Sequence, residues 1–150
     1  MQPQNAPEPH GGFVARYGPL IARLLFAPLL LGYAAMKVRA LMGSVQADAL
    51  QSFPLAQVAL YITIFVEFAG GMMLVLGYRT RLAATALIVL FVGVTGLMLP
   101  MVGAGGGMGM AYVDQIVKNL TLIGGMVLFA VHGAGPFSLD ARRGRVAAVR

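Results

Sequence analysis

Four long apolar stretches, separated by short polar segments, dominate the pattern of this chain. They cover residues 17–36, 55–76, 82–100 and 113–132. An α-helix rises about 1.5 Å per residue, so each stretch is long enough to cross the hydrocarbon layer of about 30 Å. Short connections favour antiparallel neighbours. The pattern therefore predicts an all-α, integral membrane four-helix bundle.

Proline and glycine mark the expected helix boundaries. Pro54 suits the start of the second span, while Pro28 lies inside the first and is expected to kink it. Residues 77–81 form a tight turn, and the glycines and proline of 133–136 stop the fourth span. The longest connection, 37–54, is mildly amphipathic and is expected to lie at the outer membrane interface.

The chain divides into three parts. Residues 1–12 are rich in proline, glutamine and glycine, which predicts a disordered tail. The four-helix domain occupies 13–140, and 141–150 is a basic tail. The first span is not expected to be a cleaved signal peptide, because the tail before it carries Glu8 and no lysine or arginine.

Composition supports a lipid environment and removes several chemistries. The chain is 59% hydrophobic and only 11% charged, whereas soluble domains carry about 25% charged residues. There are too few charges to cover a water-facing surface. The sequence holds no cysteine, which excludes thiol nucleophiles and thiolate-bound metal clusters.

The basic residues that give the net charge of +6 flank the spans. They therefore indicate the membrane topology, and no nucleic-acid partner is expected. On one side lie only Lys37 and Arg39. The positive-inside rule therefore places both termini in the cytoplasm. The seven basic residues on that side are Arg16, Arg79, Arg81, Arg142, Arg143, Arg145 and Arg150.

Glu67 is the only charge within the second span. A carboxylate in hydrocarbon is costly unless it has a partner or a function. Helical rise places Glu67 about 13 Å and Arg23 about 9 Å from the same end of their spans. An Arg23–Glu67 pair is therefore expected, either as a strut that fixes helix register or as part of a site in which Glu67 accepts protons.

The fourth span carries a polar stripe on its outer half. Asp114 and Lys118 are four residues apart, as are Gln115 and Asn119, so each pair shares a helix face. Lys118 either extends to the interface or lies over a cavity, where it and Glu67 would touch one ligand.

Weaker candidates complete the set. Tyr61 and Thr63 lie within two turns of Glu67 and would hydrogen-bond it or a quinone carbonyl, although packing roles also fit. His132 is the only histidine in a span, so no paired-histidine haem site is predicted. Ten methionines without supporting cysteine or histidine do not predict a copper site.

Several motifs resemble the DoxX family. They are Arg23-Leu-Leu-Phe with Lys37, then Glu67-Phe-Ala-Gly-Gly followed by Leu76-Gly-Tyr-Arg-Thr-Arg-Leu82, and lastly Lys118-Asn-Leu-Thr-Leu-Ile-Gly-Gly with Gly133-Ala-Gly-Pro-Phe-Ser-Leu-Asp140. The resemblance covers about 14–140 and departs in the glycine- and methionine-rich loop at 100–110 and in the basic tail. It implies a small four-helix protein of the bacterial inner membrane. Some members are linked with quinone-dependent oxidation, with resistance to oxidative stress, or with complexes of redox enzymes.

Three functions remain open from the sequence. The first is a membrane subunit of a redox system that binds a quinone-like molecule, with Glu67, Arg23 and Lys118 as functional residues and Tyr61, Thr63 and Asn119 as further ligand contacts. Electrons would come from a partner protein, and the sequence does not decide whether the chain is itself an enzyme. The alternatives are a scaffold subunit, packed in a complex or homo-oligomer, and a small-molecule transporter.

Overall fold

The structure is a computed structural model that describes residues 12–43, 54–103 and 109–142. The expectations for the N-terminal tail, for most of the connection at 37–54, and for the basic tail concern segments outside these ranges. The glycine-rich part of the 100–110 loop also lies outside them.

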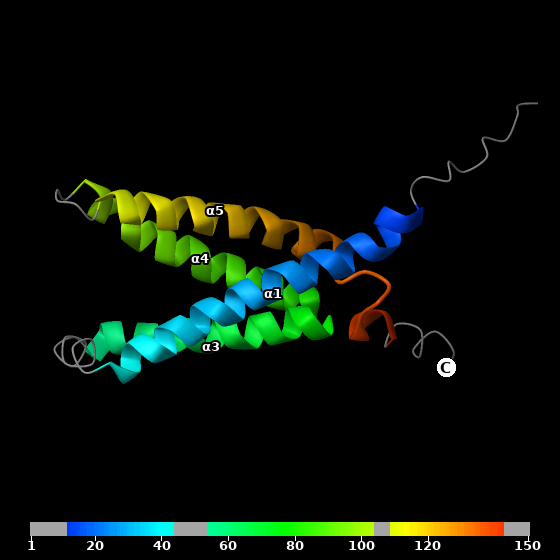
Figure 1. The fold of residues 1–150 in the computed structure, drawn as a ribbon, viewed down its shortest axis with the longest axis horizontal. Helices are drawn as coiled ribbons and strands as arrows, with labels where there is room; N and C mark the ends of the chain where they lie inside the picture. The colour runs from blue at the N-terminus through cyan, green and yellow to red at the C-terminus, as the bar shows by residue number, and fades with distance from the viewer. Residues whose placement is uncertain (1–11, 44–53, 104–108, 143–150) are drawn as a thin grey trace, which may run out of the picture.

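The described chain forms four long helices that run side by side in alternating directions (Figure 1). This arrangement confirms the all-α bundle. The closest packing is between α1 and α3 and between α4 and α5, whereas the first and last helices approach each other closely at few points. The helices are α1 (Gly12–Met42), α3 (Pro54–Leu76), α4 (Thr80–Val102) and α5 (Gly109–His132).

Helix α1 is longer than the apolar pattern predicted. It continues past residue 36, through Lys37, and ends at Met42. The sequence after Lys37 consists mostly of good helix formers, and one lysine does not end a helix. Pro28 lies inside α1 without ending it. The extra turns bring Lys37 alongside α3, which matters for the site.

The predicted turn and helix stop are both confirmed. Gly77 (φ 62°) and Arg79 (φ 43°) adopt left-handed backbone between α3 and α4, and Gly133 (φ 76°) follows the last residue of α5. Glycine suits such positions because it has no Cβ to clash. The end of the bundle that holds Gly77–Arg79 is called the turn end below, and the opposite end is called the Met42 end.

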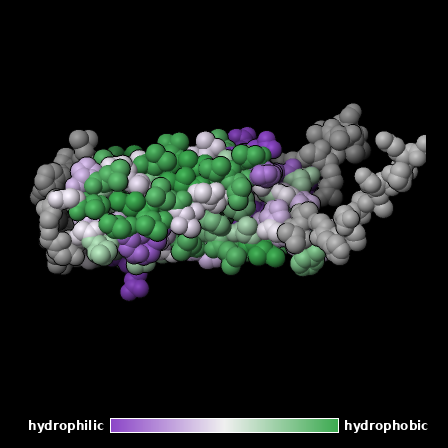
Figure 2. All heavy atoms as spheres, turned by 90° about the horizontal axis from the view of Figure 1, so that it is seen from above, coloured by the Kyte–Doolittle hydropathy of each residue, from purple (hydrophilic) through white to green (hydrophobic). Residues whose placement is uncertain are grey.

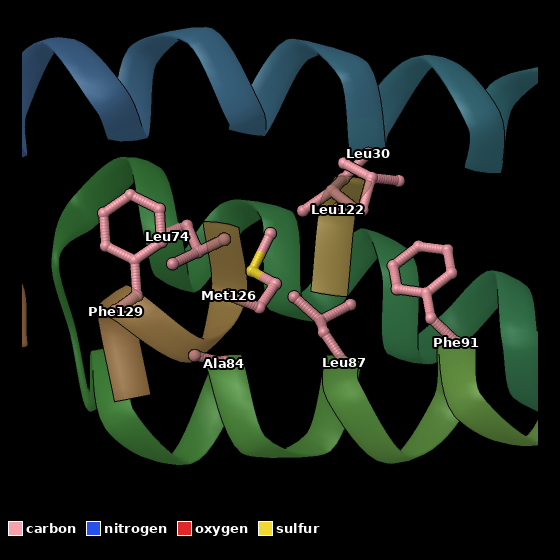
Figure 3. Packing of buried hydrophobic residues seen from close by; sticks show 8 residues of the cluster. All are labelled: Leu30, Leu74, Ala84, Leu87, Phe91, Leu122, Met126 and Phe129. Atoms are coloured by element: carbon pink, nitrogen blue, oxygen red, sulfur yellow. The ribbon is translucent and has the colours of Figure 1, made fainter. Parts of the chain in front are cut away.

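The core is a cluster of buried apolar side chains to which all four helices contribute (Figure 3). Their interdigitation fixes the spacing of the helices, as close packing does in any protein interior. The cluster consists of Leu30, Leu74, Ala84, Leu87, Phe91, Leu122, Met126 and Phe129.

The outside of the bundle is apolar. Phe65, Val89 and Leu97 are 72%, 68% and 74% exposed, which would be costly in water. Hydrophobic residues cover the middle of the long axis, and hydrophilic ones gather towards its ends (Figure 2). All four helices are long and apolar enough to cross a membrane. The chain is therefore a multi-pass membrane protein, while the side that each end faces stays a prediction.

Candidate functional site

A cavity of about 380 Å³ lies in the half of the bundle nearer the Met42 end, and all four helices line it. We call it the Glu67 cavity. Apolar side chains from α1 and α4 form part of its wall. Its polar lining residues are Tyr33, Lys37, Glu67, Gln115 and Asn119.

Glu67 is paired with Lys37, so the expected Arg23–Glu67 pair is wrong. The Lys37 Nζ atom lies 2.5 Å from Glu67 Oε1, and the Glu67 side chain is only 2% exposed. Lys37 is 31% exposed, so the carboxylate is deeper than its partner. The pair joins α1 to α3 as expected, but through a different cation.

The direction in which helical side chains lean explains the error. Long side chains in a helix point back towards its N-terminus. In the antiparallel pair α1 and α3, Arg23 therefore leans towards the turn end and Glu67 towards the Met42 end. Lys37 leans from the Met42 end towards the middle of the bundle and reaches Glu67. The depths of Arg23 and Glu67 predicted from helical rise describe the backbone positions only, and they do not include the opposite directions of the two side chains.

One carboxylate oxygen of Glu67 lacks a partner. Among the described residues, buried Oε2 accepts no hydrogen bond. An unpaired polar atom in an apolar interior costs roughly 1–3 kcal/mol, more when it is charged. Within the described ranges, Arg23 Nη1 and Thr80 Oγ1 are buried without a partner in the same way, but Glu67 in addition lines a cavity, and this combination marks it as the candidate ligand site.

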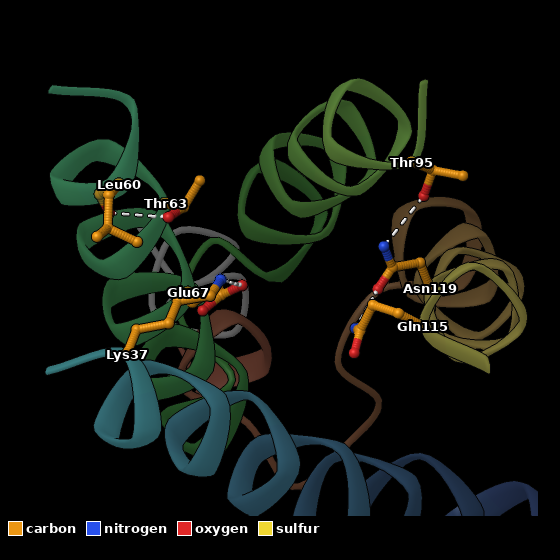
Figure 4. Close-up of polar contacts among 7 residues, drawn as sticks. All are labelled: Lys37, Leu60, Thr63, Glu67, Thr95, Gln115 and Asn119. Carbon is orange, nitrogen blue, oxygen red and sulfur yellow. Dashed lines mark hydrogen bonds and ion pairs between the residues drawn. The ribbon is translucent and has the colours of Figure 1, made fainter. Parts of the chain in front are cut away.

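The wall opposite Glu67 carries an ordered chain of amides and a hydroxyl (Figure 4). Gln115 Nε2 donates to Asn119 Oδ1 over 3.1 Å, and Asn119 Nδ2 donates to Thr95 Oγ1 over 3.1 Å. Asn119 is 1% exposed. These bonds fix the orientation of the Asn119 amide, so the wall presents set donors and acceptors.

Lys118 lies outside the Glu67 cavity. It forms an ion pair with Asp114 one turn earlier on α5, and half of its side chain is exposed. It lines a groove between α1 and α5 that also includes Tyr33. Tyr33 belongs to both the groove and the cavity, so Lys118 lies in a hollow that neighbours the site.

Tyr61 and Thr63 do not line the cavity. Tyr61 is 53% exposed and hydrogen-bonds Gln57 on its own helix. Thr63 donates to the Leu60 carbonyl over 2.8 Å. The structure therefore brings Asn119 to Glu67, as the sequence predicted, but not these two residues.

Arg23 belongs to a separate cluster at the turn end. It is 1% exposed, and its Nη2 donates to the Phe137 carbonyl over 2.5 Å. The Asp140 carboxylate attracts it and accepts hydrogen bonds from the backbone N–H groups of Arg79 and Thr80, at 2.7 and 2.9 Å. This cluster ties the segment after α5 to α1 and to the first turn of α4. We call it the Arg23–Asp140 latch.

Sequence reasoning missed Lys37 and Tyr33 as cavity residues. The sequence analysis ends the first span at residue 36, which places Lys37 in the connection. The useful indications were the helix-forming residues after Lys37 and the length of its side chain, which extends along apolar surface. In the parts of the chain that the structure describes, no three acidic, histidine or cysteine side chains gather.

The fold and cavity together define a small helical membrane protein with one buried carboxylate at an internal site. The family model of DoxX matches residues 18–100. The match covers more than half of the chain, which therefore belongs to the DoxX family. It includes Arg23, Lys37 and Glu67, whereas α5 with Asn119 lies beyond it. No curated protein and no solved structure matches the chain.

Proposed function

We propose that the Glu67 cavity binds the head of a quinone-like molecule and that Glu67 exchanges a proton with it. The observation that supports this most is the buried, unpartnered Oε2 of Glu67 beside a cavity of about 380 Å³. A quinol hydroxyl is a donor of the kind that this oxygen lacks. The ligand would arrive from the lipid, which is the solvent around this bundle.

The two polar walls suit a ring with oxygens on opposite edges. One oxygen would face Glu67 and Lys37, and the other would face the amides of Gln115 and Asn119 (Figure 4). The apolar residues between these walls would pack against the ring. Small-molecule sites combine such apolar surface with a few placed polar groups.

Lys37 takes the role that the sequence assigned to Arg23. Its ammonium group offsets the charge of Glu67 while the site is empty. When a quinol is oxidised, it loses two electrons and two protons. Glu67 would accept one proton, and the partner redox protein that takes the two electrons would take the other proton. The chain has no cysteine and one histidine in a span, so the electrons pass to or from a partner redox protein.

Binding of a benzoquinol probe, the reduced form whose hydroxyl can donate to Glu67, tests the proposal when the wild type is compared with Glu67→Gln. Glutamine keeps the shape but removes the charge and the proton-accepting oxygen. We expect the dissociation constant to rise at least about tenfold, equivalent to about 1.4 kcal/mol, and quinol turnover in a complex purified with its partner to be lost. Asp114→Asn, which neutralises an exposed acid on α5, is the matched control and should bind normally. Wild-type binding and turnover by the folded Glu67→Gln protein would refute the proposal.

A scaffold function is the second candidate, and one observation favours it. A Cβ atom added at Gly93 or Gly96 of α4 would meet nothing within 4 Å, so this face could accept a closely packed neighbouring helix. Substituting both by leucine should release a partner from the purified complex if the scaffold function holds. The transporter alternative has no comparable support, because the apolar cluster around Leu74 and Met126 lies between the cavity and the turn end.

A further inference from the structure

A lipid-facing groove follows the seam between α1 and α5. It consists of two hollows of about 320 and 350 Å³, which share Phe26 as a common wall. Gly18 and His132 lie at the turn end of the groove, and Tyr33 and Lys118 at its other end. We call this the α1–α5 groove.

Sparse packing between these two helices creates the groove. α1 packs mainly on α3, and α5 on α4. Phe26 crosses the seam, where its ring meets Phe129 edge-on at 5.7 Å. The ring lies against Gly125, at which any Cβ atom would collide with it. Phe26 is thus the wall that the two hollows share.

The groove lies next to the Glu67 cavity. Tyr33 lines both the groove and the cavity, so the two spaces adjoin at this side chain. Apart from Lys118 and Thr121, the half of the groove next to Tyr33 is lined by apolar residues and Tyr33 itself. A molecule with its polar end in the cavity would therefore continue naturally into an apolar channel.

We propose that the α1–α5 groove binds a long apolar chain, of the polyprenyl kind, attached to the head group that occupies the Glu67 cavity. This inference rests on the function proposed above and names the class of ligand: a quinone-like head with a lipid-soluble tail. From Gly18 to Tyr33 the groove spans 15 helical residues, or about 22 Å.

The depth of the polar end distinguishes this occupant from a phospholipid. Glu67 marks this polar end, and it lies 13 residues from the start of α3 at Pro54 and nine from its end at Leu76, which places it about 20 and 14 Å inside the two helix ends. A phospholipid keeps its head group at the membrane surface, whereas a chain here would have its polar end deep in the hydrocarbon. Such a ligand is largely apolar and carries its head group within the membrane.

A pair of threonines gives a controlled test. Thr121 lines the groove, and Thr85 lies on the exposed surface of α4. Each hydroxyl donates to the carbonyl four residues earlier, at 2.9 and 2.8 Å. Phenylalanine at Thr121 should fill the groove, while the same change at Thr85 should only add an apolar group that faces lipid.

Both variants are titrated in lipid nanodiscs with two probes that share one benzoquinol head, the first with a methyl group and the second with a long polyprenyl chain. We expect Thr121→Phe to weaken binding of the long-chain probe at least tenfold and to leave the short probe unchanged. Thr85→Phe should bind both probes like the wild type. Comparing each variant with wild type for the same probe cancels differences in partitioning.

The outcomes separate the two proposals. Normal binding of the long-chain probe by folded Thr121→Phe would overturn the groove proposal. The cavity proposal would still be supported if the wild type binds the short probe and Glu67→Gln does not. The long-chain probe could also bind more weakly to Thr121→Phe but normally to Glu67→Gln. The groove would then hold an ordinary lipid chain, and both proposals would be wrong. If neither probe binds the wild type, the cavity proposal is wrong, and the groove proposal, which rests on it, is wrong as well.

Discussion

Arg23 and Glu67 are both charged, both buried and both within the bundle, yet their surroundings differ. Arg23 donates to the carbonyls of Pro19 and Phe137 and lies near the Asp140 carboxylate. Glu67 pairs with Lys37 and lines the Glu67 cavity. Among the described residues each has one buried atom without a partner, Nη1 of Arg23 and Oε2 of Glu67. Burial alone therefore does not identify a functional charge. A charge held by backbone carbonyls acts as a structural tie, and a charge that lines a cavity is close to the place where a ligand would bind.

The largest expected effect follows from removing the tie. Arg23→Met would remove the hydrogen bonds that Arg23 donates to the Pro19 and Phe137 carbonyls and its attraction to Asp140. A hydrogen bond to a charged group contributes about 1.5–3 kcal/mol. We therefore expect a loss of about 3–5 kcal/mol in the free energy of unfolding, measured by circular dichroism in detergent. Arg81→Met, an exposed control at the same end, should change it by less than about 0.5 kcal/mol.

This comparison would break if Arg23→Met kept its stability and lost quinone binding instead. Arg23 would then belong to the ligand site, and the distinction between the two ends of the bundle would not hold.

Two glycines sharpen the picture of the turn end. Gly77 and Gly133 both have positive φ, so alanine is strained at either. A Cβ at Gly77 would also collide with the Arg23 guanidinium and lie 2.6 Å from Ser138 Cβ, whereas one at Gly133 would make an ordinary 3.6 Å contact with Arg81. Gly77→Ala should therefore lose about 1–3 kcal/mol more than Gly133→Ala, the usual cost of overpacking. Equal losses in thermal unfolding would mean that the latch is loosely packed.

A double-mutant cycle measures the pair at the Met42 end. Lys37→Met leaves Glu67 buried without its cation and should destabilise the protein, and adding Glu67→Gln should restore part of the loss. Contacting residues commonly couple by about 0.5–3 kcal/mol. Denaturant unfolding of the two single variants and the double variant gives the coupling energy. Purely additive effects would show that the ion pair does not form.

The smallest effects concern the two aspartates. Asp140 accepts hydrogen bonds from two N–H groups at the start of α4, as a helix cap does, so Asp140→Ala should cost about 0.5–2 kcal/mol. Asp114→Ala removes only an exposed pair with Lys118 and should cost less than about 1 kcal/mol. A reversal of this order in thermal unfolding would contradict the latch.

The helices could be predicted from sequence because lipid imposes a simple rule of length and hydrophobicity. Pro54, the turn at Gly77 and the stop at Gly133 gave correct boundaries, since each depends on backbone preferences that act locally. Glu67 and Asn119 could be recognised as unusual polar residues in apolar helices, and the structure places both on one cavity.

The partner of Glu67 could not be predicted in the same way. It depends on the length of α1, on the direction in which side chains lean, and on the register between two helices. An error of a few residues in the end of the first span was enough to exclude Lys37. Tyr61 and Thr63 were chosen by distance along the chain, but the cavity is formed by side chains from different helices.

The bond between Arg23 and the Phe137 carbonyl joins residues that are 114 positions apart. During biosynthesis the first helix therefore emerges long before this acceptor exists, and its arginine must wait until all four helices have been made. Attachment of the segment after α5 would follow the synthesis of the bundle, and a chain cut short before Phe137 would leave a guanidinium in the membrane without that acceptor.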